Sequence, residues 1–142
     1  MAAARELFGY AKLIGIEASD RLELSKKIQA GFPFQSFVIL ARHMGVTNKE
    51  LAELVQISTR ILNMRQKEGK LKGDESDRLL RFARVFTYAV DLFDGDQEAA
   101  QHWLSSENQA LKGATPLEAS MTEEGAREVE NLIVGLEHGA FI

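Results

Sequence analysis

Apolar residues recur at helical spacing along most of the chain, and this periodicity restricts its possible folds more than any other feature. Residues 79–93 show it most clearly, with apolar side chains at i, i+3, i+4 and i+7; they are Leu79, Phe82, Ala83, Phe86, Ala89, Val90 and Phe93. No segment alternates apolar and polar residues for long enough to predict a sheet, and only two prolines occur. The sequence therefore predicts an all-α fold.

Residues that start and stop helices divide this pattern into separate elements. The expected N-caps are Ser19 or Asp20, Thr47, Ser58, Asp74 and Thr122. Pro33 suits the start of a largely buried helix that ends at Gly45, while Gly31 and Gly69 are expected to end two others. We expect Asp94-Gly95-Asp96 to break the long helix that begins near residue 73, and residues 105–116 to be irregular.

Charge is distributed unevenly along the chain, whose formal net charge is -4. Between Ser58 and Gly73 there are five basic residues and a single acid, Glu68, whereas the C-terminal half carries most of the acids. One end can therefore face phosphate while the other faces a different partner. We accordingly expect two helical modules, residues 1–72 with a helix-turn-helix at about 47–67, and residues 73–142.

The segment LAELVQISTRILNMRQ, residues 51–66, has the pattern of a helix-turn-helix. Ala52 is small where the two helices approach each other, and the apolar residues that would fill their inner angle are Leu51, Val55, Ile57 and Leu62. The turn position that is often glycine is Gln56, which carries a cost at positive φ. Two ordinary packed helices are the alternative interpretation.

The outer face of the second helix is expected to enter the major groove of DNA. Thr59, Arg60 and Asn63 are candidates for base edges, because Arg pairs with guanine and Asn with adenine. The candidates for phosphate contacts are Ser58, Arg65, Lys67, Lys70 and Lys72.

Four further stretches carry a family resemblance: GKLKGDESDRLLRFARVFTYAVDLFDGD, AAQHWL, NQALKGATPLE and MTEEGAREVENLIVGLEHG. From about Phe37 onward the chain resembles the antitoxins of the Xre/MbcA/ParS group. The positions that stand at the family's spacing are Leu71, Glu75-Ser76-Asp77-Arg78, Ala83, Phe93, Trp103-Leu104, Leu111, Gly113, Pro116 and Gly125. Residues before about Ser19 match least.

The resemblance implies an antitoxin that neutralises a RES-class toxin and represses its own operon. RES toxins resemble ADP-ribosyltransferases and consume NAD, while the antitoxin holds no catalytic site and no cofactor. The C-terminal module is then the toxin-binding domain. We hypothesise that its apolar tail, with a carboxylate at its end, inserts into the toxin's dinucleotide cleft, and the residues assigned to this contact are Glu137, His138, Gly139, Phe141 and Ile142.

Other functional classes find little support in the residues. The chain has no cysteine, and its three histidines are far apart, so no metal site or catalytic constellation is expected. No apolar run is long enough to cross a bilayer and no signal layout opens the chain, which predicts a cytoplasmic protein without a membrane partner. A helix-turn-helix transcriptional regulator without a toxin partner, and an interaction protein that has lost DNA binding, remain alternatives. We expect a homodimer on operator DNA and a larger hetero-oligomer with toxin.

Overall fold

A computed structural model describes residues 8–139, and it is helical from one end of that range to the other. In chain order the α-helices are α1 (Gly9–Leu13), α2 (Arg21–Ala30), α3 (Phe34–Met44), α4 (Asn48–Leu54), α5 (Thr59–Glu68), α6 (Gly73–Leu92), α7 (Gln97–Leu104), α8 (Pro116–Ala119) and α9 (Glu123–Glu137). A short 3-10 helix, η2 (Gln109–Leu111), lies between α7 and α8. Within residues 8–139 no strand forms, and a single isolated bridge joins Pro33 to Lys70. The predicted all-α fold is confirmed.

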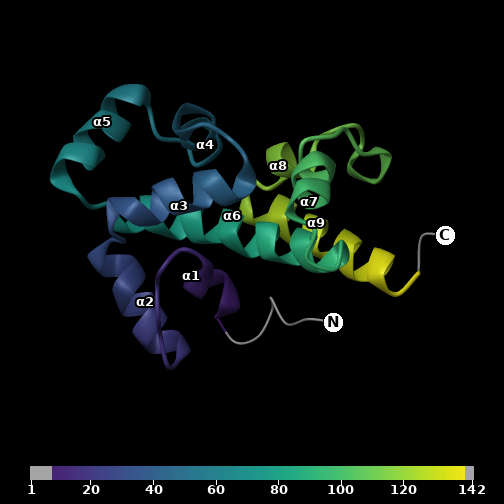
Figure 1. The fold of residues 1–142 in the computed structure, drawn as a ribbon, viewed down its shortest axis with the longest axis horizontal. Helices are drawn as coiled ribbons and strands as arrows, with labels where there is room; N and C mark the ends of the chain where they lie inside the picture. The colour runs from purple at the N-terminus through teal and green to yellow at the C-terminus, as the bar shows by residue number, and fades with distance from the viewer. Residues whose placement is uncertain (1–7, 140–142) are drawn as a thin grey trace.

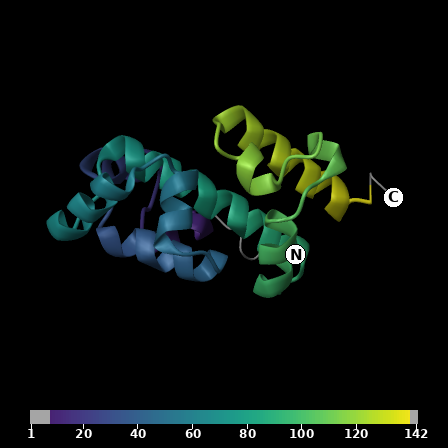
Figure 2. The ribbon, with the colours of Figure 1, turned by 90° about the horizontal axis from the view of Figure 1, so that it is seen from above.

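Helix α6 is the axis of the molecule (Figures 1 and 2). It packs on α1, α2 and α3 and also on α7 and α9, so helices from both halves of the chain share one hydrophobic core. The expected apolar stripe explains this position, because Leu79, Phe82, Ala83, Phe86 and Ala89 are all buried. The division expected between residues 72 and 73 stays a prediction, since α6 contacts helices on both sides of it.

Most of the expected capping residues act as such. Asp20, Thr47, Ser58 and Thr122 each accept a hydrogen bond from the amide three residues later. Gly31, Gly45 and Gly69 follow the last residues of α2, α3 and α5 with positive φ.

The start of α6 differs from the expectation. Its N-cap residue is Lys72, and Asp74 lies inside the first turn. The reason is tertiary, because the Leu71 amide donates to the Phe32 carbonyl and holds residue 71 in the core. The Glu75 carboxylate then accepts a hydrogen bond from the Lys72 amide and takes the capping role.

Candidate nucleic-acid interface

Helices α4 and α5 form the predicted helix-turn-helix at one end of the molecule (Figure 1). Thr47 and Glu50 close a reciprocal capping box at the start of α4, and the Ser58 hydroxyl accepts from the Ile61 amide at the start of α5. The residues expected to fill the inner angle are all buried: Leu51, Ala52, Val55, Ile57 and Leu62.

Gln56 occupies the left-handed conformation that the sequence assigned to this turn, with a φ of 63°. Its amide donates to the Glu53 carbonyl, and the next amide, of Ile57, donates to the Ala52 carbonyl at 2.8 Å. The turn therefore keeps its tight geometry without glycine. A side chain in this region costs on the order of 1–2 kcal/mol.

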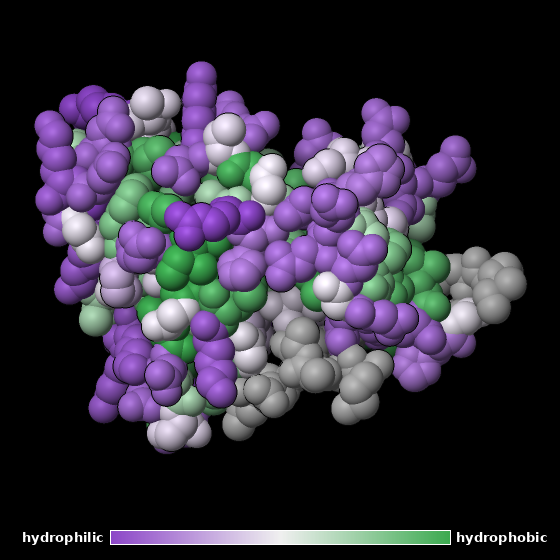
Figure 3. Space-filling model, viewed as in Figure 1, coloured by the Kyte–Doolittle hydropathy of each residue, from purple (hydrophilic) through white to green (hydrophobic). Residues whose placement is uncertain are grey.

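Most of the residues expected to contact DNA lie on the exposed side of this motif. Thr59, Arg60, Asn63 and Lys67 are exposed along α5, and Lys70 and Lys72 are exposed in the segment that leads to α6. None of these four cations forms an ion pair within residues 8–139. Hydrophilic side chains line the outer edge of this end of the molecule, with hydrophobic residues visible between them (Figure 3). Exposed cations without an ion-pair partner are available for phosphate contacts.

Arg65 is placed differently from the expectation. Only 8% of the residue is exposed, and its guanidinium donates to both carboxylate oxygens of Glu75, from Nε at 2.7 Å and from Nη2 at 2.9 Å. Nη1 also pairs with Glu68 at 3.3 Å. The expected position of Arg65 on the outer face is corrected: its donors are used inside the protein, where they join α5 to α6.

The ion pair between Arg65 and Glu75 shifts the pKa of both residues. The hydrogen bonds that Arg65 donates to Glu75 raise the pKa of Arg65 above its ordinary value. Burial raises the pKa of Glu75, but the hydrogen bonds from Arg65 and from the Lys72 amide outweigh it, so the net pKa of Glu75 is lowered. Both groups are therefore charged at neutral pH, and together they act as a structural connection.

One exposed residue of this surface escaped the sequence analysis. Met64 is 40% exposed and follows Asn63 on α5. The helical spacing from Arg60 to Met64 to Lys67 is the signal that places it on the outer face.

Three arginines at three-residue spacing on α6 connect this motif to the C-terminal helices. Arg78 Nε donates to the Val55 carbonyl at the end of α4, at 2.6 Å. Arg81 donates to the Met121 carbonyl at 2.9 Å and pairs with Glu123, while Arg84 pairs with Glu123 and Glu130 of α9. Arg78 also pairs with Asp74 of its own helix.

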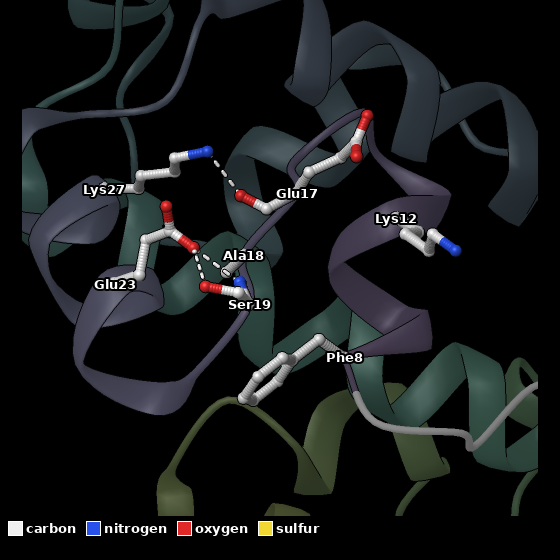
Figure 4. A pocket seen from close by; sticks show the side chains of 7 residues that line it. All are labelled: Phe8, Lys12, Glu17, Ala18, Ser19, Glu23 and Lys27. Carbon is white, nitrogen blue, oxygen red and sulfur yellow. Dashed lines mark hydrogen bonds between the residues drawn. The ribbon is translucent and has the colours of Figure 1, made fainter.

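A pocket of about 450 Å³ lies between α1 and α2 (Figure 4). Its polar groups are used locally: Glu23 accepts from the amide and hydroxyl of Ser19, and Lys27 donates to the Glu17 carbonyl. Residues 8–139 hold no group of three or more His, Asp or Glu side chains that could bind a metal ion. None of the expected DNA-contacting residues lines this pocket.

The C-terminal helices α7 and α9 pack on α6, and α8 packs on α7 and α9 (Figure 2). Helix α9 buries an apolar face, made by Ala126, Val129, Leu132 and Ile133. Of the five residues assigned to the toxin, Glu137 and His138 are exposed, Gly139 is half-buried, and Phe141 and Ile142 lie outside the described residues. In the described part of the chain, no helix combines the length and the apolar character that a membrane span needs.

Comparison with known proteins divides the chain at α6. Residues 23–84 match the antitoxin Xre-like helix-turn-helix domain, and residues 89–139 match the antitoxin Xre/MbcA/ParS C-terminal toxin-binding domain. The first match ends within α6, at residue 84, and the second begins within α6, at residue 89.

Curated relatives are similar over most of their length. An "Antitoxin Xre" of Yersinia enterocolitica is 36% identical, with 90% of this chain and 87% of the relative covered. An "Antitoxin Xre" of Photorhabdus laumondii is 32% identical over the same shares, and one of Pseudomonas putida is 28% identical over 87% of this chain and 76% of the relative. With a helix-turn-helix at one end of α6 and a toxin-binding domain at the other, the chain belongs to the Xre antitoxin family.

Proposed function

We propose that this antitoxin neutralises a RES-class, NAD-consuming toxin through its C-terminal domain and represses its own operon through α4 and α5. The observation that carries the proposal is the arrangement along α6, which joins the helix-turn-helix and the exposed cations of residues 60–72 to the C-terminal helices, in the half of the chain where most of the acids lie. The protein acts by binding, in the cytoplasm, and catalyses no reaction. The RES class comes from the family resemblance.

On the DNA side, we propose that Thr59, Arg60 and Asn63 contact base edges and that the lysines contact phosphates. The supporting facts are their exposure and the absence of ion pairs for Arg60, Lys67, Lys70 and Lys72 within residues 8–139. Ser58 is exposed as well, and its hydroxyl oxygen caps α5, so its phosphate contact uses the hydroxyl proton. Arg65 is left out of this set.

A single recognition helix contacts few base pairs, so we propose that two copies bind a two-fold symmetric operator. Toxin-bound dimers then form the larger hetero-oligomer. The separation of the two functional ends along α6 leaves both accessible in one chain (Figure 1).

On the toxin side, we propose that residues 137–142 contact the cleft that binds the dinucleotide. Glu137 and His138 end α9 at the surface, and Gly139 follows with positive φ, which turns the chain away from the helix axis. A cleft that binds NAD phosphates is rich in hydrogen-bond donors and positive charge, and Glu137 is complementary to such a cleft.

Co-expression with the adjacent reading frame tests the toxin half. We expect the toxin alone to stop growth and lower cellular NAD, and the antitoxin to restore both and to co-purify with it. Deletion of residues 139–142 is expected to weaken neutralisation while leaving operator binding intact. The double variant Arg60→Ala with Asn63→Ala is the complementary control. We expect it to lose repression of an operon reporter while still restoring growth. A protein that represses the reporter but never rescues growth or binds the neighbouring product would contradict the antitoxin–RES proposal.

A further inference from the structure

Large apolar side chains are rarely exposed in this protein, and one of them lies on the recognition helix. Among the described residues only Leu22, Met64 and Val134 belong to this class. Met64 does not pack on the hydrophobic core. In the same helix, Leu62 belongs to the core and Ile61 packs against it. Packing within the chain therefore does not account for Met64.

The neighbours of Met64 define its surroundings. On an α-helix Arg60 lies one turn before it and Lys67 one turn after it, and both are exposed. Met64 is the sixth residue after the Ser58 cap, within the first two turns, which is the part of a recognition helix that approaches base edges. The exposed apolar side chain of Met64 therefore lies between two cationic side chains that can donate hydrogen bonds to bases and phosphates.

We propose that Met64 recognises a thymine methyl group in the major groove, so that α5 reads an A·T pair by apolar contact beside the hydrogen bonds of Arg60 and Asn63. The inference rests on the proposed DNA binding. Among the four bases only thymine presents a methyl group in that groove. Methionine is unbranched and polarisable, so its side chain adapts to such a contact. The cationic neighbours Arg60 and Lys67 are complementary to a polyanion such as DNA and disfavour a neutral or basic partner surface.

Replacement of thymine by deoxyuridine tests this directly, because the two differ only in the methyl group. Duplexes bound by the parent protein are first selected from a random library. Each thymine of the selected site is then replaced singly by deoxyuridine, and affinities are measured at one fixed salt concentration. We expect one position per half-site at which the parent loses about three- to five-fold in affinity, the effect of one buried methyl group.

The variants separate Met64 from the rest of the helix. Met64→Gln keeps the length of the side chain and is expected to bind thymine and deoxyuridine duplexes equally at that position. Met64→Leu is expected to retain the preference, and so are the control variants Gln66→Ala, on the same helix, and Leu22→Ala, another exposed apolar residue. If Met64→Gln binds too weakly to measure, Met64→Leu decides: retention of the preference supports the proposal and its loss refutes it.

Two results overturn the inference in distinguishable ways. If the parent and Met64→Gln show the same thymine-to-deoxyuridine ratio at every position, DNA binding stands and the role of Met64 fails. If the parent selects no duplex, the proposed DNA binding fails and this inference fails with it. Reduced toxin co-purification with Met64→Gln, at an unchanged thymine-to-deoxyuridine ratio, would assign Met64 to a protein contact instead.

Discussion

Glu75→Ala is expected to be one of the most damaging single substitutions outside the apolar core. The Glu75 carboxylate accepts three hydrogen bonds, two from Arg65 at 2.7 and 2.9 Å and one from the Lys72 amide at 2.9 Å. The two paired side chains are only 10% and 7% exposed, so solvent screens them little. Removing one partner of a buried pair costs about 3–5 kcal/mol, and Glu75→Ala leaves Arg65 with only the longer, half-exposed pair to Glu68 at 3.3 Å.

Urea and thermal unfolding followed by circular dichroism measure this loss. We expect a decrease in melting temperature on the order of 10 °C for a chain of this size. Asp77→Ala is the matched control, because Asp77 is an exposed acid two residues further along α6, and its expected effect is within about 0.5 kcal/mol.

The double variant Arg65→Met with Glu75→Leu removes both charges and tests whether the instability of Glu75→Ala comes from the charge of Arg65 left without its Glu75 partner. Replacing a buried pair by apolar residues of similar size is often neutral or stabilising, so the double variant should recover most of the loss. If Glu75→Ala is no less stable than Asp77→Ala, or if the double variant is as unstable as Glu75→Ala, the pair is not the buried structural connection described here.

Three other predictions follow from the same geometry. Because the pKa of Glu75 is lowered in the folded state, its contribution to stability is complete above the unfolded pKa and disappears as pH falls through the folded value; in acid titrations of unfolding, parent and Glu75→Gln should therefore converge at low pH. Lys67→Gln should reduce the slope of log affinity against log salt by about 0.9 for each half-site, and an unchanged slope would exclude a phosphate contact. Gly125→Ala should lower the unfolding free energy by at least about 1–3 kcal/mol, because the new Cβ would lie 1.7 Å from the Ala119 carbonyl oxygen; equal stability would contradict the close approach of α8 and α9.

The helices and their caps follow from interactions within three or four residues, which is why the sequence alone predicts them. Thr47 with Glu50, Ser58, and Thr122 are local signals, and each acts as expected. The same kind of signal precedes α8, where Thr115 and Glu118 form a capping box that the sequence analysis missed when it assigned residues 105–116 to irregular structure.

The exposed side of α5 was also largely predictable, because a helix with two buried inner positions must turn the intervening residues outward. Residues 62 and 65 are the buried positions of α5, but only Leu62 was expected there, whereas Arg65 was expected to contact phosphate. From sequence alone an arginine at such a position is expected to lie on the surface, because burial of its charge requires a carboxylate partner that the local sequence does not show.

The carboxylate that buries Arg65 comes from Glu75, ten residues along the chain and on another helix. The same long-range packing moves the start of α6 to Lys72 and places one helix in contact with both halves of the chain. Local periodicity and capping thus determined the helices, the helix-turn-helix and most of its exposed face. Tertiary structure alone decided which charge is internal and where the two halves join, because burial and ion pairing depend on contacts between residues far apart in sequence.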